Sequence, residues 1–248
     1  MKIFTSIAPR KTDTQRLAIE SWIENGFQPV SMNSAAEIER LAPLFPEVKF
    51  IRAHRDATEL AGKPLIYIDD LLEAMAASGD KVCGLVNSDI IFRSHRNLPE
   101  WFHYAAVDGL VYGSRMDVDQ PGDTAGEIYQ VGFDYFFMDA VTAAGYPPTA
   151  LSMGAPMWDY WAPLVAILRG RNCGKVDEVF AYHVRHEAEW DNTFNIRMMK
   201  EIIDHSGIEF EGIEGVDFST LNSASGTVLH QFAQFILSFL ASHSKPVT

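Results

Sequence analysis

The sequence predicts an α/β fold with a mostly parallel central sheet and helices on both faces. In the N-terminal part of the chain, short apolar runs alternate with segments in which apolar residues recur at helical spacing. The apolar runs are continuous, which is typical of strands buried on both sides. A chain of 248 residues, 47% of them hydrophobic, is long enough to bury a sizeable core without disulfides. We expect one domain with a Rossmann-like N-terminal half and a mixed C-terminal half.

The N-terminal half is expected to contain four strands and three helices. Its apolar runs predict strands over residues 3–8, 28–32, 48–53 and 81–86. Thr12 with Gln15, and Ser34 with Glu37, have the form of capping boxes, which predicts that a helix begins at each. Pro64 is expected to open the third helix, because a proline at the first helical position loses no hydrogen bond.

The C-terminal half is less regular. Strands are expected over residues 109–115, 131–138 and 176–184, and helices over 155–170, 192–207 and 227–242. Pro163 is expected to kink the first of these helices. Residues 117–127 form a polar segment with glycine and proline, which makes them a candidate lid, and residues 208–225 have the composition of a loop.

Composition excludes several classes of protein. The net charge of -13 and the lack of a basic stripe argue against nucleic-acid binding. Cys83 and Cys173 have no metal-binding spacing and are expected to be buried thiols. Neither a signal peptide nor a transmembrane segment is recognised, so a cytoplasmic location is expected.

The stretch "LVNSDIIF" is the most informative part of the sequence. Asn87, Ser88 and Asp89 interrupt an apolar run that predicts a buried strand. A carboxylate in such a place needs a partner, a hydrogen bond or a metal. In open parallel sheets, ligands bind beyond the carboxyl ends of the strands, where this triplet is expected to lie. The absence of G-x-G-x-x-G after the first strand weighs against a dinucleotide-binding fold. The sequence also has no P-loop and no G-x-S-x-G motif, which excludes a P-loop protein and the usual hydrolase elbow.

On these residues the chain resembles glycosyltransferases of the GT-A fold, the nucleotide-diphospho-sugar transferase superfamily. Their D-x-D motif corresponds here to Asn87-Ser88-Asp89, with "GLV" before it and "IIF" after it, and "GKPLIYIDDLLEAM" resembles the preceding helix. The resemblance implies a UDP- or GDP-sugar donor, an unknown acceptor, and Mn²⁺ or Mg²⁺ bound by Asp89. Asn87 departs from the pattern, but its amide oxygen remains a possible ligand. His183, or alternatively His186, would supply a further ligand; these histidines could equally be structural.

Two other carboxylates are catalytic candidates. Asp159 lies in "MWDYW", among aromatic side chains that could stack on a sugar, and the resemblance implies a base here if the reaction inverts configuration. Asp134 interrupts an aromatic strand and could bind a sugar hydroxyl. The alternatives are a packed aromatic helix around Asp159 and an aromatic core around Asp134.

Further residues are expected to contact the nucleotide because they lie at the predicted ligand edge. By position on the first strand, Thr5, Ser6 and Ala8 would line the base pocket. Asn87 and Ser88 would lie beside it. Contacts to the nucleotide or its diphosphate are expected from Arg10, Arg52, Arg55 and Lys63, although each of these could instead be an ordinary surface charge.

The resemblance thus predicts a metal-dependent glycosyltransferase, with residues 1–115 binding the nucleotide sugar and residues 116–248 forming the acceptor side and the C-terminal helix. Two alternatives remain open. A sugar-phosphate nucleotidyltransferase would use a similar sheet, but the segment after the first strand lacks the glycine-rich loop of those enzymes. A catalytically inactive nucleotide-sugar-binding protein would account for Asn87.

Overall fold

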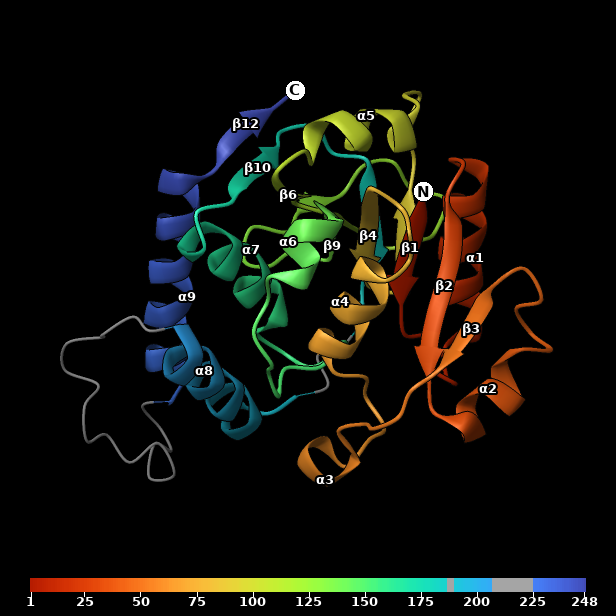
Figure 1. The fold of residues 1–248 in the computed structure, drawn as a ribbon, viewed down its shortest axis with the longest axis horizontal. Coiled ribbons are helices and arrows are strands. Elements are labelled where there is room, and N and C mark those ends of the chain that lie inside the picture. Colours follow the sequence, from red (N-terminus) through yellow and green to blue (C-terminus); the bar gives the residue numbers. More distant parts are fainter. Residues whose placement is uncertain (187–189, 207–224) are drawn as a thin grey trace.

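The computed structural model describes residues 1–186, 190–206 and 225–248 (Figure 1). An eight-stranded sheet runs through it in the order β12-β10-β6-β9-β4-β1-β2-β3. Its strands are β1 (Lys2–Thr5), β2 (Gln28–Asn33), β3 (Lys49–Arg52), β4 (Val82–Val86), β6 (Gly109–Gly113), β9 (Tyr135–Asp139), β10 (Asn172–Val176) and β12 (Lys245–Val247). Only β9 runs antiparallel to its neighbours within this sheet, so the prediction of a mostly parallel, GT-A-like α/β fold is confirmed.

Helices cover both faces of this sheet, as the continuous apolar strands predict. One face packs on α4 (Ile68–Ala76), α6 (Ala140–Ala144), α7 (Trp158–Leu168), α8 (Asn192–Ser206) and α9 (Ser225–His243). The other packs on α1 (Thr12–Glu24), α2 (Ala35–Leu41) and α5 (Leu98–Ala105). A short α3 (Thr58–Ala61) lies at the margin of the first core, against which its Leu60 packs. Successive residues of β4 supply both cores, because side chains of a strand alternate between its faces: Leu85 joins the first and Val86 the second.

A second, four-stranded sheet has the order β5-β11-β7-β8. It comprises β5 (Ile90–Phe92), β7 (Met116–Val118), β8 (Glu127–Ile128) and β11 (Ala181–Val184). The apolar run 85–92 is therefore two strands in two sheets, joined by the turn at Asn87-Ser88-Asp89. The predicted strand 176–184 is also divided, because β10 ends at Val176 in the large sheet and β11 begins at Ala181 in the small one.

Of the three helix starts predicted for the N-terminal half, the structure confirms the capping box of α2 and differs at α1 and α4. The Ser34 capping box is confirmed, with hydrogen bonds in both directions between Ser34 and Glu37. The Thr12 box is wrong: the N-cap residue of α1 is Lys11, in a left-handed conformation (φ 50°), and no side chain of the described residues caps the helix. Pro64 precedes α4, which begins at Ile68.

The later helices follow the predicted pattern. Pro163 lies inside α7, which is otherwise apolar on nearly every side. The predicted helices 192–207 and 227–242 correspond to α8 and α9, and the predicted loop 208–225 falls almost wholly outside the described residues. Within the described ranges, no helix combines the length and the apolar character needed to traverse a bilayer.

Candidate metal and ligand site

A cleft of about 1300 Å³ opens at the carboxyl ends of β1, β2, β4 and β6. It concentrates basic side chains in a protein whose net charge is -13. The basic residues that line it are Arg10, Lys11, Arg40, Lys63, Arg115 and Arg185, and the acidic ones are Glu37, Asp89, Asp117 and Asp134. Because the surrounding protein is acidic, this local excess of basic groups favours an anionic ligand here over the rest of the surface.

Asp89, His183 and His186 meet in this cleft. The Asp89 Oδ2 atom lies 3.6 Å from His183 Nε2 and 3.5 Å from His186 Nε2. All three ligand atoms lie within 4.8 Å of one another, close enough to bind one ion. The structure thus brings together Asp89 and His183, which the resemblance pairs, and adds His186, which it offers as the alternative.

The small sheet explains why these residues meet. Asp89 directly precedes β5, and β5 pairs antiparallel with β11 so that Ile90 lies opposite His183. His183 is therefore fixed beside Asp89 by strand register, and its side chain is almost fully buried. His186 follows two residues after β11 and is more exposed.

Asp117 completes the cluster from the other side of His183. Its Oδ1 atom lies 3.1 Å from His183 Nδ1 and accepts a hydrogen bond from Arg115 Nε at 2.8 Å. The sequence predicts a loop at Asp117, but the residue lies on β7 as the strand partner of His183. No signal in the sequence marks β7, which is three residues long and only partly buried.

Hydrogen bonds between these groups outweigh the effect of burial on their pKa values. Burial acts to lower the pKa of His183, but its bonds with Asp117 and Asp89 raise it to about 9. Burial acts to raise the pKa of Asp89, but bonds from His183 and His186 hold it well below its usual range. Likewise, bonds from His183 and Arg115 lower the pKa of Asp117 to about 2, against burial. At neutral pH two ionised carboxylates therefore flank the His183 ring.

Arg115 joins this cluster to the predicted catalytic residue Asp134. The guanidinium forms an ion pair with the Asp134 carboxylate, and the two side chains are 14% and 9% exposed. Asn87 Nδ2 donates to Asp134 Oδ1 at 2.5 Å, and the Asn87 backbone N–H donates to the Asp134 carbonyl at 2.9 Å. Asn87 stands where the GT-A motif has aspartate, and its side chain donates a hydrogen bond to Asp134. Asp134 lines the cleft and is ion-paired with Arg115.

Asp159 is half-buried beside the wall of the cleft. Tyr129 and Asp134, its neighbours, line the cleft, whereas Asp159 does not. Its Oδ2 atom accepts a hydrogen bond from the Phe133 backbone N–H at 3.1 Å, and lies 2.9 Å from where a Cβ on Gly132 would be. Burial raises the pKa of Asp159 to about 7, with the charge of Asp134 adding to the effect.

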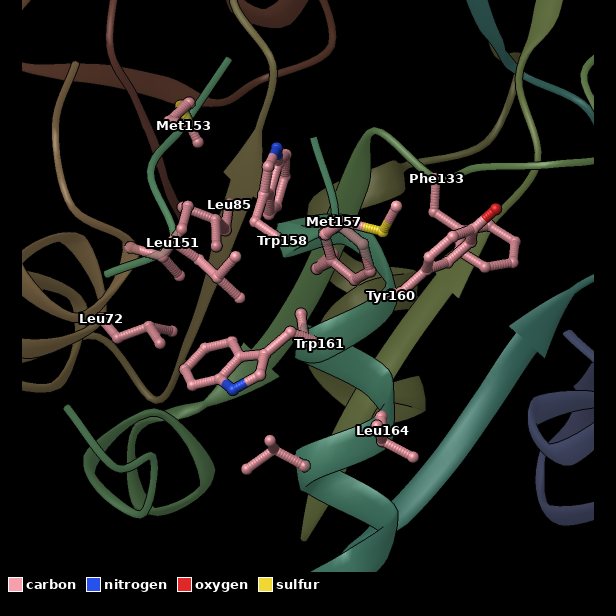
Figure 2. Close-up of a cluster of buried hydrophobic side chains, with 14 of the residues drawn as sticks. Leu72, Leu85, Phe133, Leu151, Met153, Met157, Trp158, Tyr160, Trp161 and Leu164 are labelled. Carbon is pink, nitrogen blue, oxygen red and sulfur yellow. The ribbon is translucent and has the colours of Figure 1, made fainter. Parts of the chain in front are cut away.

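The aromatic residues around Asp159 do not form a sugar-stacking surface, and that expectation is wrong. Trp158, Tyr160 and Trp161 are at most 5% exposed. Figure 2 shows Trp158 and Trp161 within the cluster of apolar side chains that also contains Leu85 and Leu151. Their packing between α7 and the sheet is the alternative that the sequence left open.

We expect Asp159→Asn to stabilise the protein above pH 7 by about 1 to 2 kcal/mol. Because the folded state has the higher pKa, it binds more protons than the unfolded state between about pH 4 and 7. Relative to Asp159→Asn, the stability of the wild type should therefore fall as the pH rises from about 4 to 7. Above pH 7 the difference stays constant, because Asp159 is then ionised in both the folded and the unfolded state. Asparagine stays neutral and can still accept the bond from Phe133.

Urea unfolding of both proteins at pH 4 and pH 8 tests this expectation. Asp13→Asn is a matched control, since Asp13 also lies in the first turn of a helix but is exposed. Loss of that charge near a helix N-terminus should give a small change of the opposite sign. A difference between Asp159→Asn and wild type that is equal at both pH values would contradict a raised pKa.

The residues predicted to contact the nucleotide divide into two groups. Ser6, Ala8, Arg10, Lys63, Asn87 and Ser88 line the cleft. Thr5 is fully buried and faces the Met153 sulfur, at 3.6 Å from its Oγ1. Arg52 is exposed and is not among the lining residues, and Arg55 is held by ion pairs with Asp69 and Asp70.

Gln15 holds together the wall of the cleft that contains Ala8, Arg10 and Ser88. The sequence predicts only a helix-capping role for Gln15. Its Oε1 atom accepts hydrogen bonds from the Ala8 backbone N–H and the Ser88 hydroxyl, both at 2.7 Å. Its Nε2 atom donates to the carbonyls of Ala8 at 2.8 Å and Arg10 at 2.6 Å. The loop after β1 is thereby fixed against the Asn87-Ser88-Asp89 turn.

The predicted polar loop 117–127 forms the β7–β8 hairpin and its turn. Arg93 donates to the carbonyls of Pro121 and Asp123, and Arg185 forms ion pairs with Asp119 and Glu127, both at 2.8 Å. Two arginines from outside the hairpin therefore hold it in place at one side of the cleft.

Comparison with known proteins establishes the fold. No family model and no curated protein matches the sequence. Among solved structures, the chain is similar to the mannosyltransferase PcManGT from Pyrobaculum calidifontis, solved in complex with GDP-Man and Mn²⁺. The TM-score is 0.52 at 10% identity, over 98% of this chain and 73% of that one.

Two weaker similarities have TM-scores of 0.41 and 0.40. The first is to a Bacillus anthracis protein named as a glucose-1-phosphate thymidylyltransferase, at 11% identity over 88% of this chain and 98% of that one. The second is to HddC from Yersinia pseudotuberculosis complexed with GMP-PN, at 9% identity over 74% and 88%. At such identities only the fold carries over, and the stronger match shows that this chain has the mixed α/β, GT-A-like fold.

Proposed function

We propose that this protein is a glycosyltransferase that uses a nucleotide-diphosphate sugar as donor and a divalent metal ion as cofactor. The observation that carries the proposal is the convergence of Asp89, His183 and His186 in a cleft that concentrates basic side chains at the carboxyl edge of the sheet. An anionic donor and a metal ion can both be accommodated there. The fold, shared with a mannosyltransferase, agrees with this chemistry.

The donor atoms fit Mn²⁺ better than Mg²⁺. One carboxylate and two imidazoles can bind from this cluster, and Mg²⁺ prefers a shell of oxygen atoms alone. His183 also has a carboxylate on its second ring nitrogen, the usual arrangement for a metal-binding histidine. When bound, such a metal offsets the negative charge that develops on the leaving nucleoside diphosphate.

The N-terminal half, residues 1–115, is proposed to bind the nucleotide. Ser6, Ala8 and Ser88 line the cleft where β1 and β4 end. Lys63 and Arg10 bring positive charge to the same cleft, which suits a diphosphate. Asn87 remains a proposed contact through its amide oxygen, since its nitrogen is used by Asp134.

The C-terminal half, residues 116–248, is proposed to form the acceptor side. Asp134 is accessible from the cleft but paired with Arg115, so it suits hydrogen bonding to a hydroxyl better than proton abstraction. Asp159 has the pKa, about 7, that suits a proton acceptor at neutral pH, and would take this role if an acceptor reaches past Tyr129.

Isothermal titration calorimetry with UDP- and GDP-sugars, with and without Mn²⁺, tests the proposal. We expect one nucleotide sugar to bind tightly only when Mn²⁺ is present, and Mg²⁺ to support weaker binding. An acceptor panel should then show release of the nucleoside diphosphate. Absence of binding to every nucleotide sugar would contradict the proposal, and formation of a nucleotide sugar from a sugar 1-phosphate and a nucleoside triphosphate would replace it with a nucleotidyltransferase.

A further inference from the structure

We propose that Asp117 is a positioning residue for the metal: it fixes the orientation and the tautomer of His183. This inference rests on the proposed function, because it concerns the same metal site. It assigns a role to a carboxylate that lies on the far side of His183 from Asp89.

The register of the small sheet places Asp117 and His183 side by side. β7 and β11 are parallel neighbours, and Asp117 is the strand partner of His183. On the other side of β11, His183 is the partner of Ile90, the residue after Asp89. The backbone thus places one carboxylate on either side of the ring, so that each ring nitrogen has its own acidic neighbour.

The chemistry of Asp117 determines which nitrogen carries a hydrogen. An ionised carboxylate only accepts hydrogen bonds, so His183 Nδ1, 3.1 Å from Asp117 Oδ1, must be the donor. When the ring is neutral, Nε2 then has the free lone pair, and this is the atom that faces Asp89 and the metal. With the opposite tautomer, Nε2 would present a hydrogen to the metal and could not bind it.

Asp117 is itself held rigidly. Arg115 Nε donates to the same Oδ1 atom at 2.8 Å, and both side chains are largely buried. On its outer side β7 pairs with β8, where the position of a Cβ on Gly126 would lie 2.1 Å from the Asp117 carbonyl oxygen. Only glycine allows this close approach, so the hairpin fixes the backbone of Asp117 while Arg115 fixes its carboxylate.

Titration of the purified protein with MnCl₂ tests the inference. We expect Asp117→Ala to weaken Mn²⁺ binding by about 10- to 100-fold. Asp117→Asn should recover part of this loss, because the amide oxygen can still accept from His183 Nδ1. Asp119→Ala is the matched control: Asp119 follows on the same hairpin but pairs with Arg185, and its replacement should leave Mn²⁺ affinity unchanged.

Co²⁺ provides a second measurement that a merely structural role would not change. The visible absorption of bound Co²⁺ depends on its ligands, so loss of His183 coordination in Asp117→Ala should shift the band relative to wild type and to Asp119→Ala. If Asp117→Ala matches wild type in Mn²⁺ affinity and Co²⁺ spectrum while Asp89→Ala does not bind, the role of Asp117 is refuted and the proposed function stands. If wild type itself binds no Mn²⁺, both are refuted.

Discussion

Asp89→Ala is expected to lower the affinity for Mn²⁺ by about 100-fold or more, and to abolish Mn²⁺-dependent binding of the nucleotide sugar. Asp89 provides the only carboxylate in the proposed ligand group, and its oxygen lies within 3.6 Å of both histidine nitrogens. Without it, two imidazoles remain, and no negative charge among the ligands attracts the cation. Calorimetry with MnCl₂, followed by the nucleotide sugar, measures both effects.

A surface carboxylate of the same cleft region provides the control for this experiment. Asp119 is 74% exposed and pairs with Arg185, so Asp119→Ala removes the same charge without touching the cluster. Circular dichroism should show both variants folded at the temperature of the titration. Wild-type affinity for Mn²⁺ in Asp89→Ala would mean that the cluster is not the metal site.

Arg115→Met should lower the free energy of unfolding by about 3 kcal/mol. The Arg115 guanidinium links Asp117 to Asp134. Among the residues that the structure describes, its removal leaves the buried Asp134 carboxylate with Asn87 as its remaining side-chain partner. Methionine keeps an unbranched, flexible stem but loses the guanidinium, whose contact with the Tyr129 ring at 4.2 Å contributes less than its pairing with the carboxylates. The cost therefore arises mainly from the uncompensated charge.

Arg185→Met serves as a comparison for that measurement. Arg185 also joins two carboxylates, Asp119 and Glu127, at 2.8 Å each, but these are 74% and 86% exposed. Exposed ion pairs contribute little, so the loss should stay below about 1 kcal/mol. Urea unfolding curves give both values, and equal losses in the two variants would show that burial of the Arg115 pair has no energetic consequence.

Sequence patterns are sufficient to predict those parts of the fold and the site that depend on residues close together in the chain. The apolar run before Asn87 predicted β4, and the rule that ligands bind at carboxyl ends of strands placed Asp89 in the cleft. Ser34 and Glu37 predicted a cap that forms as expected, because its atoms lie within one turn of helix. His183 was found as a polar residue at a strand end.

The remaining residues depend on contacts between distant segments. Asp117 lies on a strand too short to have a pattern of its own, and it exists as a strand only because β11 and β8 pair with it. Nothing in the sequence distinguishes Arg115 from the other basic residues. Its burial depends on the ion pair with Asp134, which lies 19 residues further along the chain. Gln15 had a plausible local use as a cap, but the backbone groups after β1 satisfy its side chain instead.

The position of β11 between β5 and β7 has a consequence for how the protein is made. β5 and β7 are not neighbours in the small sheet, because β11 lies between them. The four-stranded sheet therefore forms only after β11 has paired with both. Contacts between segments so far apart along the chain form late, because closing the intervening loop costs entropy first. On the ribosome, Asp89 emerges long before His183. Capacity to bind a metal through this cluster therefore arises only once β11 has paired with β5, and a chain that ends before β11 lacks it.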